Sequence, residues 1–248
     1  MNIIVCMKQV PDSETRVKIA GDGKSIDLSS VNFVINPFDE FAIEEAIKLK
    51  EKFGGEVTVL TLGPDRAEND LRKALAMGSD KAILLKADNF NGDVAHALTE
   101  QIKTMPYDLI LFGKQAIDED SSQMPQIVAE MLDVPSVTVV VKLDVDANSK
   151  QCVAEREIEG GKEIVEFTLP AVISAQKGLN EPRLPNLKGI MAAKKKPLEK
   201  KEPAKSQSMY EIVAMELPPP RPAGKIVGKG AEAVPELLRL LHEEAKVI

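Results

Sequence analysis

Apolar runs of strand length alternate with amphipathic helical patterns over the first 135 residues of the chain. Strands are predicted at 3–7, 57–62, 82–85 and 109–112, and helices at 37–53, 65–77, 94–104 and 124–132. Strands that alternate with helices in this way usually pair in parallel and are covered by helices on both faces. The order therefore predicts an α/β chain built on a mainly parallel, doubly wound sheet.

The first predicted helix carries start and stop signals. Asn36 is a good N-cap residue and Pro37 suits the first helical position, where no N–H group is needed. Glu44 and Lys48 are spaced to form an ion pair on the exposed face of this helix. Gly54 and Gly55 then end it.

The pattern changes after residue 135. Three or four β-rich runs follow one another without helices, with turn residues at Asn148-Ser149 and Gly160-Gly161, which predicts an antiparallel β extension of the sheet. Residues 194–206 are rich in Lys, Glu and Pro and are expected to be a linker. The chain is therefore divided into a domain at 1–197 and a linker with a C-terminal arm at 198–248. The arm ends in an amphipathic helix near 232–246 that carries Leu237, Leu238 and Leu241 on one side.

Composition removes several classes of function. The chain has only two cysteines, far apart in sequence, and two histidines, which are too few to indicate a zinc site, another metal centre or a Ser–His–Asp triad. No catalytic residue is therefore proposed. No Walker A motif is present. The net charge of -7 and the absence of Trp disfavour nucleic-acid binding. No apolar run could span a membrane and no targeting segment is visible, so a bacterial-type cytoplasmic protein is expected.

Three loops that enter helices are expected to lie along one edge of the sheet, at NPFDE (36–40), TLGPD (61–65) and LFGKQAIDEDSSQMPQ (111–126). In open α/β sheets ligands bind at the carboxyl ends of the strands, and a helix N-terminus offers free backbone N–H groups to an anion. The convergence favours a nucleotide pocket. Ordinary capped loops explain the same residues about equally well.

A basic segment interrupts this acidic chain. Between Lys177 and Lys201 there are eight Lys and Arg residues against two Glu, with prolines and apolar residues among them. Taken alone, these lysines could be a solvated surface over a leucine that belongs to the core.

Several stretches together resemble the beta subunit of electron transfer flavoprotein: VCMKQVPD, NPFDEFAIEEAIKLKEK, ALAMGSDKA, GKQAIDEDSSQ, VAEREIEGG, LPAVISA and LNEPRLPNLKGIMAAKKKP. The match is collinear over roughly 1–197. It implies a Rossmann-like, adenine nucleotide-binding fold and a heterodimer with an alpha subunit. FAD would lie at the subunit interface and be held mostly by alpha, and the beta subunit would bind AMP as a structural ligand. The matching positions for AMP are Cys6, Asn36, Pro37, Phe38, Asp39, Leu62, Gly113, Lys114, Gln115, Ala116, Ile117, Asp118, Glu119, Asp120, Ser121, Ser122, Gln123 and Met124.

The resemblance also gives the basic segment a role. Residues 175–197 correspond to a recognition loop in which Leu187 is the anchor that enters an apolar pocket on a partner dehydrogenase. Partner-binding residues are expected at Leu187, Arg183, Lys194, Lys195 and Lys196, and Glu157 is expected to meet the alpha subunit. The implied function is an electron carrier, not an enzyme. It would take electrons from flavin dehydrogenases, such as the acyl-CoA dehydrogenases of fatty acid oxidation, and pass them to a quinone-linked oxidoreductase.

Two alternatives remain open. The KQVPDS start resembles a branch of the family that bifurcates electrons and holds a second FAD in place of AMP, whereas the NEPR and AKKKP elements belong to the AMP branch. A lone nucleotide-binding protein of the universal-stress type would explain the first 135 residues, but neither the antiparallel extension nor the basic segment.

Overall fold

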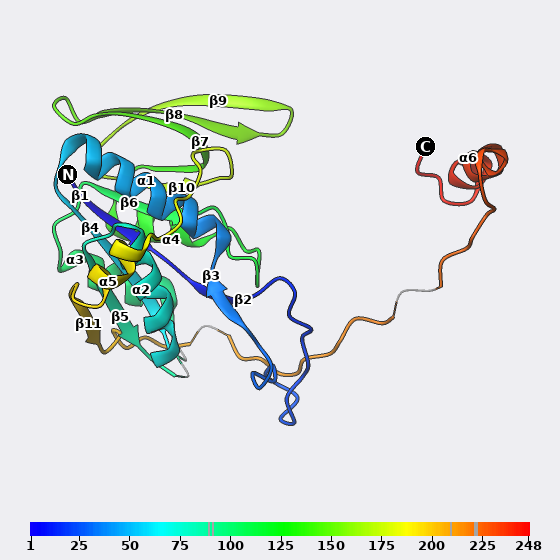
Figure 1. The fold of residues 1–248 in the computed structure, drawn as a ribbon, viewed down its shortest axis with the longest axis horizontal. Coiled ribbons are helices and arrows are strands. Elements are labelled where there is room, and N and C mark those ends of the chain that lie inside the picture. Colours follow the sequence, from blue (N-terminus) through cyan, green and yellow to red (C-terminus); the bar gives the residue numbers. More distant parts are fainter. Residues whose placement is uncertain (89, 91, 209, 221–222) are drawn as a thin grey trace.

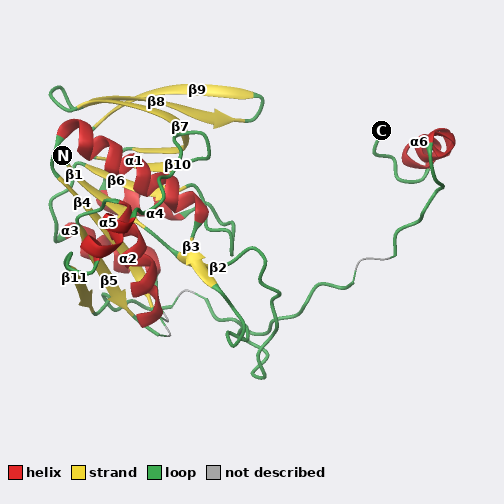
Figure 2. Ribbon diagram, viewed as in Figure 1, coloured by secondary structure: helices red, strands yellow, loops and turns green. Residues whose placement is uncertain are grey.

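The structure, a computed structural model, describes residues 1–88, 90, 92–208, 210–220 and 223–248. Among these residues a nine-stranded sheet has the order β11-β5-β4-β1-β6-β10-β7-β8-β9 (Figures 1 and 2). The strands in that order are Leu198–Lys201, Lys81–Lys86, Glu56–Gly63, Asn2–Cys6, Leu109–Gly113, Ala171–Ala175, Ser136–Asp146, Gln151–Ile158 and Gly161–Thr168. Pairing is parallel from β11 to β7 and antiparallel from β7 to β9, so the predicted α/β sheet is confirmed.

Helices cover both faces of the sheet. They are α1 (Pro37–Phe53), α2 (Glu68–Met77, preceded by the 3-10 turn Asp65–Ala67), α3 (Val94–Lys103) and α4 (Met124–Leu132), with the short helix α5 (Leu187–Ala193) packed on α2. Helix α6 (Val234–Glu243, preceded by the 3-10 turn Ala231–Ala233) lies apart from the sheet. Alternate residues of β1 enter two separate cores. Ile3 and Val5 pack with residues of α1 and α2, whereas Ile4 and Cys6 pack with residues of α3 and α4. The sheet is therefore doubly wound, because a strand turns successive side chains to opposite faces.

Helix α1 ends as expected but uses its polar residues differently. Gly54 takes the C-cap with φ 72°. Asn36 occupies the N-cap position without a side-chain cap bond, because its amide is engaged with the loop after β6. The predicted pair between Glu44 and Lys48 is wrong. Glu44 is buried and binds Arg183, and Lys48 lies near Glu45 instead.

The β extension forms only in part as predicted, because β10, expected within the antiparallel extension, pairs in parallel with β6 and β7, and the predicted linker does not form. Strands β7, β8 and β9 make an antiparallel meander with turns at the two predicted places, and β10 returns to the parallel part of the sheet. Residues 198–201, expected in a linker, form the edge strand β11 beside β5. Leu198 packs on the first core, and Lys200 pairs with Asp65 and Glu68. The body of the protein thus extends beyond the predicted boundary at residue 197.

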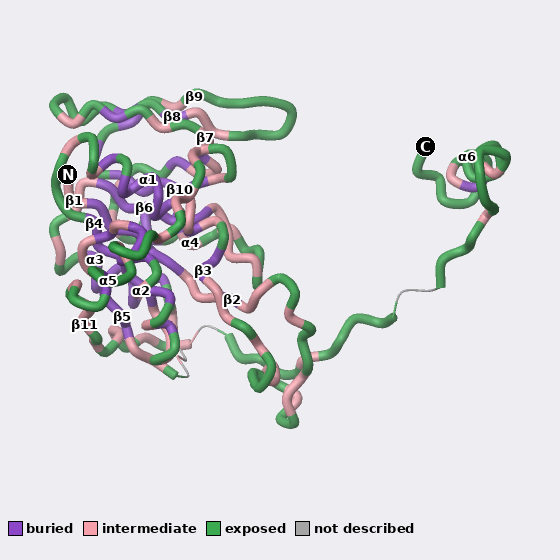
Figure 3. The backbone as a smooth tube through the Cα atoms, in the orientation of Figure 1, coloured by how far each residue is buried: buried purple, intermediate pink, exposed green. Residues whose placement is uncertain are grey.

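The segment after β11 first follows the body, where the Ser206 hydroxyl accepts from the N–H of Asp93 at 2.7 Å, and then runs away from it as an extended arm that ends in α6 (Figures 1 and 3). Leu240 is buried, while Leu237 and Leu238 are 43% and 51% exposed. Arg221 and Pro222, part of a proline-rich run in the arm, lie outside the described residues. Within the described part of the chain, no helix has both the length and the apolar character needed to cross a membrane.

A small antiparallel ribbon, β2 (Gln9–Pro11) and β3 (Phe33–Ile35), stands between β1 and α1. The long connection within it, residues 12–32, projects from the body on the same side as the beginning of the arm (Figure 1). The backbone N–H of Met215 donates to the carbonyl of Gly23 at 2.8 Å, so the tip of this connection contacts the arm.

Candidate functional site

The chain changes direction across the sheet at β1. It runs from β1 through β4 to β5 on one side, and then returns to β6 on the other side of β1. Such a reversal leaves a crevice at the carboxyl ends of the strands, the usual ligand site of an open α/β sheet. The loops after β1 and β6 and the start of α1 meet there. The loop after β4 lies at the same edge, where the Thr61 hydroxyl donates to the carbonyl of Met7 at 2.6 Å, so the three loops selected from sequence share one edge of the sheet as predicted.

Asp39 joins the ends of β1 and β6. Its carboxylate accepts hydrogen bonds from the backbone N–H of Lys8 at 2.7 Å and from that of Gly113 at 2.9 Å. Burial raises the pKa of Asp39 to about 7, although the two N–H donors and Asn36 act in the opposite direction. Asp39 was expected to contact AMP, and the structure shows that both its oxygens are bound within the chain.

Gly113 is required at the end of β6. A Cβ atom there would lie 2.6 Å from the backbone carbon of Phe38 and would overlap the Asp39 carboxylate. The close approach holds the start of α1 against the end of β6. Cys6, expected at the pocket, packs its side chain in the second core, where burial raises the pKa of its thiol.

The loop from Lys114 to Gln123 is fixed by Asn36 and by polar side chains of its own. The amide of Asn36 donates to the carbonyl of Gln115 at 2.8 Å and accepts from the N–H of Ile117 at 3.2 Å. Gln115 donates to Asp120 at 2.6 Å and accepts from the Ser122 hydroxyl at 3.1 Å. The loop is therefore ordered by long-range and internal bonds.

Charge at this loop is partly balanced. Lys8 Nζ lies 2.9 Å from Asp118 and 3.5 Å from Glu119, so these acids do not present unopposed negative charge. Lys114 Nζ lies 5.4 Å from the centre of the Phe38 ring, a cation–π contact.

Beyond these charges, α4 begins without a side-chain cap at Gln123, which leaves N–H groups of its first turn for an anion. The other expected positions in this region are Pro37, Leu62, Ala116, Ser121 and Met124. Of these, Pro37 and Ser121 are exposed, whereas Leu62 and Met124 pack partly buried against the second core.

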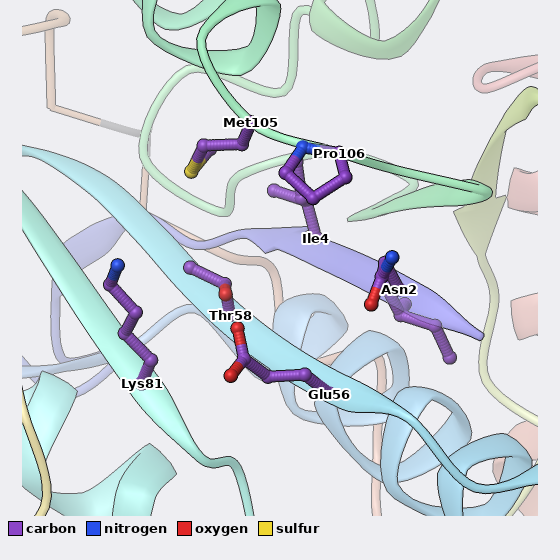
Figure 4. A pocket seen from close by; sticks show the side chains of 8 residues that line it. Asn2, Ile4, Glu56, Thr58, Lys81, Met105 and Pro106 are labelled. Atoms are coloured by element: carbon purple, nitrogen blue, oxygen red, sulfur yellow. The ribbon is translucent and has the colours of Figure 1, made fainter.

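A small cavity lies at the opposite edge of the sheet (Figure 4). Its volume is about 70 Å³, and it is lined at the amino ends of β1, β4 and β5 by residues that include Asn2, Thr58 and Lys81, with Pro106 above them. Ligand pockets are usually several times larger, roughly 300–1,000 Å³. This cavity is therefore too small for a nucleotide.

The basic segment presents apolar side chains on the short helix α5. Leu187 is 75% exposed and Met191 64% exposed, and Ile190 stands between them on the same face at i+3 and i+4 spacing. Asn186 caps the helix by accepting from the N–H of Gly189 at 2.8 Å. Leu187 is thus a surface residue and not part of the core. Ile190 and Met191 were not predicted from the sequence, although their spacing from Leu187 could have indicated them.

The predicted cations of this segment divide into two groups. Lys194 and Lys195 are exposed. Arg183 is bound within the chain, to Glu44 at 2.8 Å and to Glu51 at 2.6 Å. Lys196 is also bound within the chain, to backbone carbonyls of α2 and the turn after it. Glu157, on β8, is exposed and accepts from the Gln176 amide at 3.0 Å.

Comparisons with known proteins agree with this architecture. A family model described as electron transfer flavoprotein domain matches residues 25–206. The electron transfer flavoprotein subunit beta of Bacillus subtilis is 43% identical over the full length of both chains. The protein of the same name from Syntrophomonas wolfei is 43% identical over 90% of this chain and 88% of its own. Protein FixA of Azotobacter vinelandii is 41% identical over 78% of this chain and 72% of its own.

The family model covers most of the body, from the connection after β2 to the residues beyond β11, and the relatives extend the likeness across the arm. The chain therefore belongs to the electron transfer flavoprotein family, as a beta subunit with a role in electron transfer.

Proposed function

We propose that this chain is the non-catalytic half of a heterodimeric electron transfer flavoprotein. In this proposal the alpha subunit supplies most of the FAD site, and the beta chain supplies an adenylate site, a docking surface for dehydrogenases and an arm that packs on alpha. The heterodimer takes electrons from flavin dehydrogenases such as acyl-CoA dehydrogenases and delivers them to a quinone-linked oxidoreductase. The observation that carries the proposal is the exposed apolar face of α5 beside exposed lysines.

The docking surface, defined as Leu187, Ile190 and Met191 with Lys188, Lys194 and Lys195, suits a partner that binds briefly. One buried leucine contributes roughly 1.5–3 kcal/mol, which is enough for a binding hot spot but not for a permanent complex. Lysines around such an anchor raise the rate of encounter with an acidic partner surface. An electron shuttle needs both rapid capture and easy release.

The adenylate site is proposed at the carboxyl ends of β1 and β6. The residues fit AMP in three respects: the uncapped start of α4 can receive the phosphate, the loop 114–123 is held in one shape by Asn36, and Lys8 balances the nearby acids. Asp39 and Gly113 also fix the shape of this site, because the Asp39 carboxylate joins the ends of β1 and β6. AMP bound here contributes stability and not redox chemistry, because adenine has no accessible electron-transfer step.

The arm and Glu157 are proposed as contacts with the alpha subunit. Leu237 and Leu238 are about half exposed on α6, which stands apart from the body of this chain. An amphipathic helix with an unburied apolar side gains stability when a partner covers that side. Glu157 lies on the outer hairpin and is accessible to a cation from a partner.

The test is co-expression with an alpha subunit of the same organism, followed by release and chromatography of the bound cofactors. We expect co-purification with one FAD and one AMP for each heterodimer. Two FAD molecules and no AMP would instead support the branch in which a second flavin occupies the beta chain. A beta chain that purifies alone, without flavin or adenylate, would refute the proposed function.

A further inference from the structure

Helix α5 packs directly on α2. Ala193 at the end of α5 is buried in the first core. Gly189 lies so close to α2 that a Cβ atom at this position would overlap the carbonyl oxygen of Ala76. The two helices therefore approach backbone to backbone, and this leaves Leu187 and Met191 on the outward side.

Arg72 of α2 satisfies the end of α5. Its Nη1 donates to the carbonyl of Ala193 at 2.9 Å and to the carbonyl of Lys196 at 2.9 Å. The last carbonyls of a helix have no partner within the helix, and a cation near them also interacts favourably with the helix dipole. Arg72 is therefore a C-terminal cap supplied by the neighbouring helix.

Lys196 in turn caps the end of α2. It follows α5, and its Nζ donates to the carbonyl of Leu75 at 2.9 Å and to that of Ser79 at 2.5 Å, at the end of α2. Burial lowers the pKa of Lys196. Arg72 of α2 thus caps α5, and Lys196 of the segment after α5 caps α2; we call this arrangement the reciprocal cap.

The segment before α5 is fastened to a different helix. Arg183 makes ion pairs with Glu44 and Glu51 of α1, and Glu44 is almost fully buried. The Asn180 amide donates to the carbonyl of Phe41 at 3.0 Å and to Glu45 at 2.9 Å. The docking segment is therefore attached at both ends, while its apolar side chains stay exposed.

We propose that Arg72 and Lys196 are positioning residues of the docking surface. They hold α5 in one place on α2, so that Leu187 and Met191 are already in the conformation that a partner binds. This inference rests on the proposed docking function of α5. Association costs free energy for every segment that becomes ordered, so a helix already fixed in its bound position binds more tightly than a mobile one with the same contacts. Lys196 acts through the position of α5 and does not contact the partner.

Two lysines of the same segment provide a matched test. Lys196→Met keeps the length and the apolar stem of the side chain but removes the cap, and Lys194→Met removes the same charge from an exposed position. Both variants are made in the co-expressed heterodimer. The assay is steady-state reduction of the heterodimer by an acyl-CoA dehydrogenase of the same organism, with the heterodimer concentration varied, at low salt and at about 0.5 M salt, where surface charges are screened beyond about 5 Å.

For Lys196→Met we expect KM for the heterodimer to rise roughly tenfold at both salt concentrations, with kcat unchanged, because the cost of ordering α5 is not electrostatic. Lys194→Met acts on encounter alone, so its effect on KM should disappear at the higher salt concentration. Hydrogen exchange of the α5 amides should be faster in Lys196→Met and unchanged in Lys194→Met. Arg72→Gln should raise KM and speed α5 exchange as Lys196→Met does. Arg72→Lys should bring both values part of the way back to those of the wild type.

The inference is overturned if Lys196→Met loses its effect at high salt as Lys194→Met does, or if its α5 amides exchange faster while KM stays the same. A variant that does not assemble is replaced by Arg72→Lys, which keeps the charge and weakens only the two-carbonyl geometry. Leu187→Ala separates this inference from the proposed function. An unchanged KM for Leu187→Ala refutes the docking role of α5 itself. If Leu187→Ala raises KM, but Lys196→Met and Lys194→Met change KM alike at both salt concentrations, only the positioning role is refuted.

Discussion

Leu187→Ala is the most direct test of how this chain meets its partners. In the structure Leu187 is 75% exposed, so the truncation removes little packing from the chain itself. The substitution deletes three carbon atoms, each of which contributes about 0.8 kcal/mol when it becomes fully buried. Scaled to the part of the side chain that a partner can still cover, the loss on docking is about 1–2 kcal/mol.

That loss corresponds to a rise of roughly 5- to 30-fold in KM for the heterodimer, since about 1.4 kcal/mol is a factor of ten. The assay is the reduction of the heterodimer by an acyl-CoA dehydrogenase, with the thermal unfolding midpoint and the flavin absorption spectrum measured on the same sample. We expect the midpoint and the spectrum to stay unchanged, because Leu187 touches neither the core nor the crevice at the strand ends.

Leu28→Ala is the matched control. Leu28 is 46% exposed in the connection between β2 and β3, outside the docking surface. Its substitution by alanine should leave KM unaltered. Equal KM values for wild type and Leu187→Ala would refute the reasoning. So would a rise in KM that is accompanied by a large fall in the unfolding midpoint, because the leucine would then support the fold and not the partner.

Three further predictions concern other parts of the chain. Burial raises the folded-state pKa of Asp39 to about 7, whereas an aspartate in an unfolded chain ionises near 4, so the folded state keeps a proton that the unfolded state releases between about pH 4 and pH 7. The free energy of unfolding of the wild type should therefore fall relative to that of Asp39→Asn as the pH rises through this window. Denaturant titrations of both proteins at pH 5 and pH 8 measure this difference. The opposite trend would mean that the two N–H donors outweigh burial. Gly113→Ala forces a Cβ atom against Phe38 and should destabilise the protein by about 1–3 kcal/mol and release AMP, measured by denaturation and by cofactor chromatography; a variant with full adenylate content would contradict the crevice as its site. Removal of the residues after Pro203 takes away surface contacts such as the bond from the N–H of Asp93 to the Ser206 hydroxyl. The described residues after Pro203 contribute nothing to the two cores, so the body should stay folded and the heterodimer should weaken in size-exclusion chromatography at low concentration. Unaltered co-elution with alpha would count against the arm as a contact.

The periodicity of the chain was enough to predict four strands of the parallel sheet, β1, β4, β5 and β6, and the four helices α1 to α4, but not the parallel strands β10 and β11. A strand or helix that is buried on one side must repeat its apolar residues with a fixed spacing, and that spacing is a local property of the sequence. The helix at 124–132 agrees with α4 at both ends, and the turns of the β extension fall where the sequence indicated. The exposed Leu187 was expected from resemblance alone, because a leucine among lysines does not reveal whether it is buried.

Long-range polar pairing could not be predicted in the same way. Glu44 was assigned to Lys48 because the two are close along a helix, but the structure places Arg183 over Glu44. Lys194 and Lys196 are alike in sequence, and only the packing of α5 on α2 exposes one and directs the other to the carbonyls of Leu75 and Ser79. Residues 198–201 are mostly charged, and only the unpaired edge of β5 makes a strand of them.

What this sequence determined by itself is the main strands and helices of its first 135 residues and the face that each one buries, since both follow from residue types a few positions apart. The tertiary structure alone decided which partners the polar groups found: Asp39 with Lys8 and Gly113, and the reciprocal cap between α2 and α5. The physical reason is that a buried donor or acceptor must find a partner wherever the fold brings one within reach, and that distance is fixed by packing and not by separation along the chain.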